Sequence, residues 1–233
     1  ACSAQKDVPV TAHADSFLKI EVEEDIGPKT KGYYCSVIAI LMLFLQLSKE
    51  DSGKWISRML KTIDLIPDIA KQTKQWYESE KDELKRFKNI IVIGYDKCIP
   101  AATEGALKIL ETVQCCVRYY ELEEFMHGIY HGIDKSTLIL ALGNQSRHLD
   151  RMIRLLGYLK EHKNATTYLI SQNKVTKHDF SYPFIEDSLF VSFEYLTVLQ
   201  VLGELMCHDR GIDLYDTADE NFHEYMESYV YEK

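Results

Sequence analysis

The chain has 233 residues and a formal net charge of −9, and 46% of its residues are hydrophobic. A chain of this length and composition can bury a sizeable core without disulfides or a structural metal. The acidic balance argues against non-specific binding to nucleic acid or to an anionic membrane, so we expect neither as a partner. It leaves room for a small cationic pocket that binds a phosphate.

Six cysteines are scattered along the chain, and no CxxC pair or zinc-ligand spacing occurs among them. Such a pattern is typical of reduced thiols in a protein from a reducing compartment. We therefore predict a cytoplasmic protein without a metal site.

The first 50 residues predict strand pieces, a loop and one apolar helix. Strand alternation is clearest in Phe17–Val22, and residues 23–32 form a loop that contains Pro28 and two glycines. The apolar run Cys35–Leu47 is too short to span a bilayer and predicts a buried helix. The chain has no initiator Met and opens on a strand, so we expect the sequence to begin inside a longer protein.

Residues 53–86 have helical periodicity, and Pro67 within them predicts a division into two helices. From residue 89 onward, short apolar runs alternate with helical patterns. We predict strands over 89–94, 115–122, 136–143, 165–172 and 180–184, helices over 100–113, 144–162 and 187–210, and a short helical turn over 123–133.

Strands that alternate with helices in this way predict an α/β fold, a three-layer αβα sandwich with a parallel sheet. In an open parallel sheet, ligands bind beside the carboxyl ends of the strands. We therefore expect the functional loops to follow residues 94, 122, 143 and 172. The helix over 100–113 begins at that edge, which favours a functional interpretation of its polar residues.

Three charged residues, Glu104, Lys108 and Glu111, share the polar face of this helix. Their spacing is also typical of a solvated helix face with an i,i+4 Glu–Lys pair. Beside a ligand, a carboxylate can transfer a proton between neighbouring carbons of a sugar, and a lysine can bind a substrate oxygen. The spacing alone favours a solvated helix face, whereas the position at the strand ends favours a functional site.

A second group lies in the short helical turn, where Glu123, His127 and His131 share one helical face. Three interpretations remain open for it: surface histidines, a metal site, or a catalytic histidine that protonates a ring oxygen. The spacing is not that of a zinc protease motif, and two glycines in the turn loosen any helix here.

Two stretches resemble one known family. The run Pro100–Glu111 (PAATEGALKILE), followed by a strand and by Glu123–Gly128 (EEFMHG), is similar to the second sugar-isomerase (SIS) module of the isomerase half of glucosamine-6-phosphate synthase. Relatives of that module include the fructosamine-6-phosphate deglycases. The loop Asp25–Lys31 (DIGPKTK), which leads into the apolar helix, resembles the loop at the end of the family's first SIS module.

The resemblance implies the SIS fold, with one complete module and part of a preceding one. Residues 1–50 then form the C-terminal part of a first SIS module, 51–86 the connecting helices, 87–210 the second SIS module and 211–233 a C-terminal tail. It also implies a homodimer with a shared active site, a 6-phosphorylated sugar or sugar-amine adduct as substrate, and no cofactor.

The resemblance also implies a role for each charged residue. Glu111 stands at the position of the base that transfers a proton between C1 and C2 of the sugar, and Lys108 at that of an adjacent active-site lysine. His127 corresponds to a histidine that assists ring opening and that the family contributes across a dimer interface. Glu104 also stands at a family position, and we assign it to substrate binding.

Further substrate contacts are expected from the upstream loop and from the tail. Pro28 and Lys29 are the loop residues that we assign to substrate binding. The synthase tail carries a lysine that contacts the open-chain sugar, but this tail has no lysine before Lys233. The tail candidates are therefore His223 and Tyr225.

The missing tail lysine favours a fructosamine-6-phosphate deglycase over a synthase. After the strand over 136–143 the chain reads GNQSRHLDRM, without the phosphate loop of a working SIS module, which in this family belongs to the first module. The alternatives are an aldose–ketose isomerase, aminotransferase or deaminase acting on glucosamine or fructose 6-phosphate, and a sugar-phosphate-sensing regulator without turnover.

Overall fold

A computed structural model describes residues 1–23, 27–49, 51–216 and 220–227, apart from the side chains of residues 216, 220 and 223. Its centre is a five-stranded parallel sheet in the order β4-β3-β5-β6-β7. The strands are β3 (Asn89–Gly94), β4 (Cys116–Glu121), β5 (Thr137–Gly143), β6 (Thr166–Ser171) and β7 (Phe180–Ser181). All five lie within the ranges predicted from the sequence.

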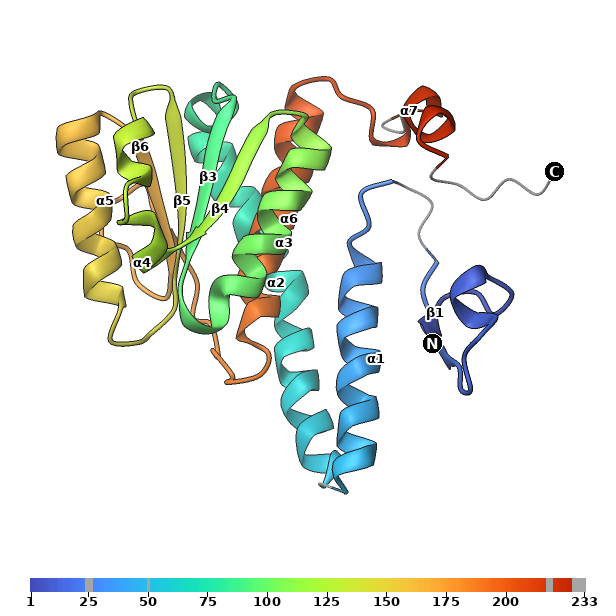
Figure 1. The fold of residues 1–233 in the computed structure, drawn as a ribbon. Coiled ribbons are helices and arrows are strands. Elements are labelled where there is room, and N and C mark those ends of the chain that lie inside the picture. The colour runs from blue at the N-terminus through green and yellow to red at the C-terminus, as the bar shows by residue number, and fades with distance from the viewer. Residues whose placement is uncertain (24–26, 50, 217–219, 228–233) are drawn as a thin grey trace.

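Two layers of helices cover the sheet (Figure 1). One face carries α2 (Ser52–Leu84), α3 (Ile99–Val113) and α6 (Val191–Asp209), and the other carries α4 (Leu122–Phe125) and α5 (Leu149–Lys163). Alternate residues of β3 face the two layers: Ile90 and Val92 the first, Ile91 and Ile93 the second. All four are fully buried, as parallel strands covered on both faces require. The predicted three-layer αβα sandwich is confirmed.

The remaining elements of the described chain are β1 (Cys2–Ser3), η1 (Pro9–Thr11), β2 (Leu18–Lys19), α1 (Lys31–Ser48), η2 (Asp96–Cys98), η3 (Ile129–Gly132), η4 (Leu214–Asp216) and α7 (Glu220–Tyr225). β1 and β2 form a separate parallel pair, with Cys2 opposite Leu18. The predicted strand Phe17–Val22 is therefore only two residues long. The assignment of residues 1–50 to a first SIS module stays a prediction.

The prediction that Pro67 divides residues 53–86 into two helices is wrong. α2 runs over 33 residues with Pro67 inside it. Pro67 is exposed, so its ring displaces no core side chain, while Thr62 and Ile69 on either side of it are fully buried. Packing of both halves against the core therefore offsets the helix hydrogen bond that a proline removes.

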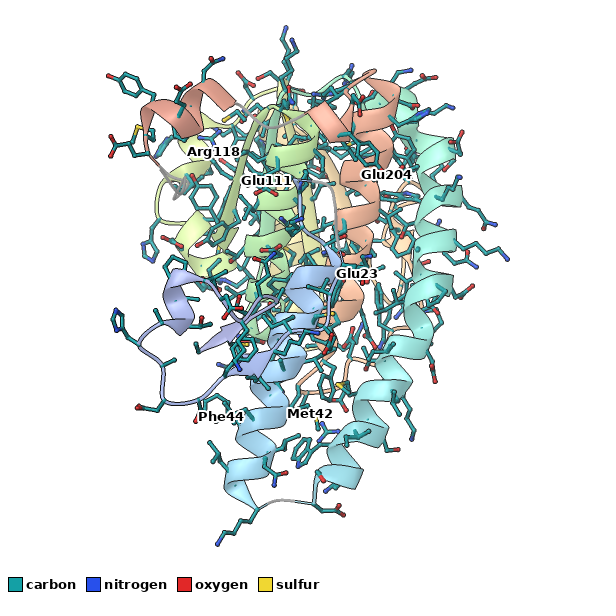
Figure 2. The ribbon with its side chains drawn as sticks, turned by 90° about the vertical axis from the view of Figure 1, so that its right-hand side faces the viewer. Glu23, Met42, Phe44, Glu111, Arg118 and Glu204 are labelled. Carbon is teal, nitrogen blue, oxygen red and sulfur yellow. The ribbon has the colours of Figure 1, made fainter. Side chains whose placement is uncertain are left out.

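The prediction that the helix after the loop is buried is also wrong. α1 forms, but none of its residues is buried. Ile40, Leu43, Phe44 and Leu47 follow one helical face, and Phe44 and Leu47 are 64% and 69% exposed. Figure 2 shows Phe44 on the part of α1 that lies away from Glu111. By length and composition α1 could cross a membrane, but the core helix of a soluble protein passes the same test, so this is weak evidence.

A buried polar cluster ties the loops at the carboxyl edge of the sheet to α6. Glu194, in the first turn of α6, is fully buried and accepts hydrogen bonds from the backbone N–H groups of Ile185 and Glu186 at 3.2 and 3.0 Å. The Glu186 carboxylate accepts from the Tyr195 hydroxyl at 2.7 Å and from the Gln145 N–H at 2.8 Å. These partners satisfy both carboxylates, the buried one of Glu194 and the half-buried one of Glu186, and so hold the loops against α6.

The stability of the fold should depend on the protonation of Glu194. Burial raises the pKa of its carboxyl group from 4.5 to about 7. In the unfolded chain the pKa returns to its ordinary value, so the folded state binds the proton more tightly between these two values. We expect the free energy of unfolding to fall by on the order of 2 kcal/mol as the pH rises from about 4.5 to about 7.

Urea unfolding at a series of pH values measures this dependence. The Glu194→Gln variant cannot ionise, so its free energy of unfolding should change less over the same pH range. Equal slopes in the two proteins would show that Glu194 is not the responsible group.

Candidate functional site

The polar face of α3 holds three ions in contact. Lys108 Nζ lies 2.7 Å from Glu111 Oε2 and 3.5 Å from Glu104 Oε1. The lysine side chain is 6% exposed, against 15% for Glu104 and 35% for Glu111. A solvated helix face would leave the lysine in water, so that interpretation fits poorly. The arrangement places a buried positive charge beside an accessible carboxylate.

The Glu104 carboxyl group is perturbed by this environment. Burial raises its pKa above the ordinary value, the positive charge of Lys108 opposes the rise, and the charge of Glu111 adds to it. A carboxyl group that is largely removed from water and paired with one cation is a suitable hydrogen-bond partner for sugar hydroxyl groups.

Two glycines fix the position of α3 against α6. A Cβ atom on Gly105 would lie 2.1 Å from Leu199 Cδ1 and 2.8 Å from Leu199 Cβ. A Cβ atom on Gly203, in α6, would lie 2.8 Å from Thr112 Oγ1. The absent side chains therefore let the two helices approach closely. Gly105, between Glu104 and Lys108 in the sequence, serves packing rather than chemistry.

The three ions do not lie at the carboxyl edge of the sheet, where the sequence analysis places the functional loops. α3 begins at that edge but runs back along β3, and Cys116 after it pairs with Asn89, the first residue of β3. At 1.5 Å per residue, Glu111 is about 18 Å along the helix from Ile99. Glu111 accordingly lies two residues before the end of α3, which the chain leaves to enter β4. The carboxylates lie along the side of α3, away from the strand ends.

A cavity of about 640 Å³ lies between this side of α3 and the N-terminal segment. Its lining comes from three places in the sequence: Ser3, Ala4, Gln5, Ile20 and Val22; Lys29, Gly32, Tyr33 and Ser36; and Glu104, Leu107 and Lys108. The volume is typical of a site for a small molecule. The cavity brings together Glu104, Lys108 and Lys29 of the predicted residues. Glu111 does not line the cavity, but it forms an ion pair with Lys108, which does.

Tyr33 and Ser36 line the cavity and were not predicted from the sequence. Burial raises the pKa of the Tyr33 hydroxyl, and the Glu104 carboxylate adds to the rise, so this hydroxyl is a neutral hydrogen-bond donor at ordinary pH. Tyr33 and Ser36 lie three residues apart in α1, which places them on one side of that helix, while Lys29 lies in the loop before it. That periodicity was the available signal.

His127 lies apart from the three ions of α3. It follows α4, on the other face of the sheet, and is exposed. No contact or cavity of the described residues joins it to Lys108 or to either carboxylate. The His131 ring lies against that of Tyr130, with centroids 4.3 Å apart and the planes tilted by 32°. The catalytic role of His127 stays a prediction and would need a second copy of the chain.

The other predicted positions divide as follows. Pro28 is buried beside Lys29 but is not in the cavity lining. The side chain of His223 lies outside the described part of the structure, as do Asp25 and Ile26 of the upstream loop. Tyr225, the second tail candidate, is 87% exposed.

The metal interpretation of the histidine turn finds no support in the structure. Glu123 forms an ion pair with Arg151, with Oε1 2.5 Å from Nε. Within the ranges that the structure describes, no three His, Cys, Asp or Glu side chains form a group that could hold a metal ion.

Comparisons with known proteins agree with this fold. Residues 83–177 match the family model of the SIS domain. The glutamine–fructose-6-phosphate aminotransferase (isomerizing) of Wigglesworthia glossinidia brevipalpis is 25% identical over 221 residues, which cover 90% of this chain and 35% of that protein. The chain thus spans about a third of the length of this curated relative.

Two solved structures extend the likeness. A proposed phosphosugar isomerase from Clostridium difficile superposes with a TM-score of 0.88 at 26% identity, covering 97% of this chain and 66% of that one. A proposed sugar-binding protein from Salmonella typhimurium gives 0.75 at 28% identity, covering 86% and 62%. The match to the SIS domain, the curated relative and the shared fold agree with the resemblance carried by the EGALK and EEFMHG runs. The chain therefore contains an SIS domain over residues 83–177 and is similar in sequence and fold to SIS-domain phosphosugar isomerases.

Proposed function

We propose that the protein acts on a 6-phosphorylated sugar, and that its reaction is the hydrolysis of a fructosamine 6-phosphate to a sugar phosphate and an amine. The observation that carries the proposal is the buried Lys108 held between Glu104 and Glu111 at the edge of a ligand-sized cavity. Proton transfer at a sugar carbon needs a positioned carboxylate, and the substrate oxygen that gains negative charge needs a cation close to it.

The proposed reaction has two steps. Glu111 takes a proton from C1 of the open-chain ketosamine and returns it at C2, and the N–H proton passes to the C2 oxygen. The C2 carbonyl thereby becomes a CH–OH group and the C1–N bond becomes an imine. Water then adds at C1 and the amine leaves with the protons of that water. Lys108 and Glu104 bind substrate oxygens, Lys29 and Pro28 contribute from the upstream loop, and His223 from the tail. No cofactor enters this scheme.

Ring opening must precede the first step, because the proton on C1 becomes acidic only when C2 is a carbonyl. We assign this role to His127. Its exposed position on the other face of the sheet supports an active site shared between two copies of the chain. A homodimer is therefore part of the proposal.

The N-terminal region supports a two-module organisation. β1 and β2 are a parallel pair, and a parallel sheet needs cover on both faces. The exposed apolar side of α1 likewise offers a packing surface. We infer that residues 1–50 are the end of a first SIS module, 51–86 connecting helices, 87–210 the second module and 211–233 the tail. The six unpaired cysteines suit a cytoplasmic protein.

A substrate panel tests the proposal. We expect turnover of 6-phosphorylated ketosamines, with release of free amine and sugar phosphate detected by mass spectrometry. Turnover of glucosamine 6-phosphate or fructose 6-phosphate instead would identify a deaminase or an isomerase. Phosphosugar binding without any turnover would favour the sugar-sensing alternative, and no binding would overturn the proposal.

A further inference from the structure

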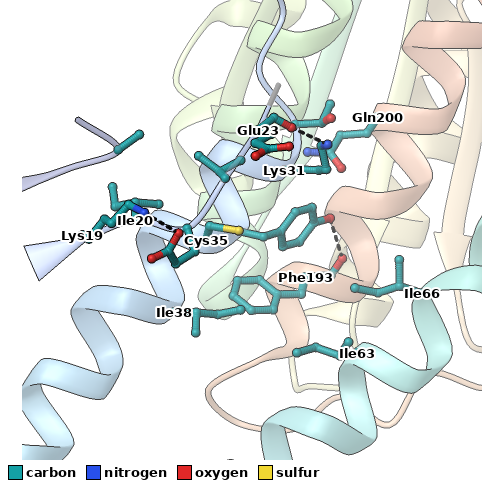
Figure 3. Close-up of a pocket in the computed structure, with 15 residues that line it drawn as sticks. Lys19, Ile20, Glu23, Lys31, Cys35, Ile38, Ile63, Ile66, Phe193 and Gln200 are labelled. Atoms are coloured by element: carbon teal, nitrogen blue, oxygen red, sulfur yellow. Dashed lines mark hydrogen bonds and ion pairs between the residues drawn. The ribbon is translucent and has the colours of Figure 1, made fainter. Parts of the chain in front are cut away.

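A second cavity adjoins the one beside α3. It has a volume of about 870 Å³ and lies between the N-terminal segment, α1, α2 and α6 (Figure 3). Ala4, Ile20 and Val22 line both cavities, so the two meet beside this segment. The first turns of α1 contribute to both, with Tyr33 in the smaller cavity and Tyr34 in the larger.

The α1 wall between the cavities is anchored to α6. The Tyr34 hydroxyl lies 3.0 Å from Thr197 Oγ1 and donates to the Phe193 carbonyl at 3.3 Å. The Tyr34 ring also packs edge-on against the Phe193 ring, with centroids 5.0 Å apart. These contacts hold the start of α1 in place, so the second cavity has fixed walls.

One end of the second cavity is apolar and the other is polar. Ile38, Ile63, Ile66 and Phe193 form the apolar end, from three different helices. At the other end, Figure 3 shows Gln200, Lys31 and Glu23 together. Lys31 Nζ donates to the backbone carbonyl of Glu23 at 2.5 Å, which fixes an ammonium group at this end.

Gln200 is the anomaly in this lining. Its Nε2 atom is buried and has no hydrogen-bond partner in the described structure. A buried amide donor without a partner is costly, and such a group in a cavity wall is suited to a ligand that accepts a hydrogen bond. The Lys31 ammonium at the same end offsets the charge of the Glu23 carboxylate, and it can pair with an acceptor of negative charge.

We propose that this second cavity binds the amine part of the substrate, and that the amine is an amino acid with an apolar side chain. Its carboxylate accepts from Gln200 Nε2 beside the Lys31 ammonium, and its side chain packs on Ile38, Ile63 and Ile66. The sugar phosphate stays in the cavity of Glu104 and Lys108. This inference rests on the proposed deglycase function.

Two substrates and one variant test it. The substrates are the 6-phosphorylated ketosamines of leucine and of 3-methylbutylamine, which is the same amine without the carboxylate. In the full-length protein, Gln200→Leu removes the donor and keeps the size of the side chain. We expect kcat/KM for the leucine adduct to fall about tenfold or more, the effect of losing one hydrogen bond to a charged group. For the amine adduct we expect less than a twofold change.

The matched control is Gln75→Leu, at an exposed position of α2 outside both cavities. It should leave kcat/KM unchanged for both adducts. An equal loss for both adducts in Gln200→Leu, or no loss for either, would overturn the assignment of the second cavity while leaving the deglycase function intact. Absence of turnover of every ketosamine phosphate by the wild-type protein would instead remove the proposed function, and this inference with it.

Discussion

Replacing Glu111 with glutamine should lower the turnover of a fructosamine 6-phosphate by about 10³-fold, because general-base catalysis contributes about 10²- to 10⁴-fold. Glutamine keeps the shape of the side chain but cannot take the proton from C1. Binding of the phosphosugar should remain measurable, since Lys108 keeps Glu104 as an ion-pair partner at 3.5 Å. Steady-state kinetics and isothermal titration calorimetry of the same preparation separate the two effects.

The control for this variant is Glu204→Gln, which removes one exposed carboxylate from α6 (Figure 2). It should leave both turnover and binding unchanged. Unchanged turnover in Glu111→Gln would exclude Glu111 as the base.

Mixing Glu111→Gln with His127→Ala protein should restore part of the activity if one site uses residues of two chains, and no recovery at all would contradict a shared site.

Replacing Gly105 with alanine should destabilise the protein by about 3 kcal/mol, at the upper end of the usual cost of overpacking a core. The added methyl group would lie 2.1 Å from Leu199 Cδ1 and 2.8 Å from Leu199 Cβ, so moving the end of the leucine side chain does not relieve the overlap. α3 and α6 would have to separate. Urea-induced unfolding followed by circular dichroism measures the change.

Gly157 provides the matched control, because it lies in α5 and a Cβ atom there would meet nothing within 4 Å. Gly157→Ala should stabilise the protein by about 0.5 to 1 kcal/mol, since alanine is the better helix former. In Gly105→Ala with Leu199→Ala, the combined loss should be smaller than the sum of the single losses. A loss below 1 kcal/mol in Gly105→Ala alone would show that the helix contact is looser than described.

The sheet domain could be predicted from the sequence because each of its strands carries a distinct local signal. The run NIIVIG is continuously apolar, as a strand buried on both faces must be, and it is β3 in the structure. The amphipathic pattern after it predicted α3 to within one residue at its start. Local pattern and tertiary burial agree in this part of the chain.

The predictions for Pro67 and for α1 failed because rules based on local sequence do not account for tertiary contacts. Pro67 is a helix breaker by itself, but packing on both sides of it keeps α2 continuous. The apolar composition of α1 predicts burial, but composition does not say which surface covers it, and Phe44 is exposed. Glu194 could have been noticed as an acid between Phe193 and Tyr195 in an apolar stretch of the helix, but only the fold reveals that it is buried.

The sequence predicted which types of residue form the candidate site, but it did not predict where the site lies relative to the sheet. Helical spacing correctly joined Glu104 and Lys108, but the strand-end rule put them at the wrong position, because a helix leaves the edge of the sheet along its length. The cavity residues Tyr33 and Gln200 come from segments far from the EGALK run. Only the packing of α1 and α6 brings them near it.

Leu199 and Gln200 are neighbours on α6 and have different surroundings. Leu199 packs against Gly105, next to the two charged residues of the sugar cavity, and Gln200 lines the second cavity. One helix therefore sets the distance between the two ends of the proposed substrate. Leu199 and Gln200 are separated by about 1.5 Å along the helix axis and by about 100° around it. This fixed separation would select among amines by the length of their side chains. A slip of α6 by a single turn would change which amines fit.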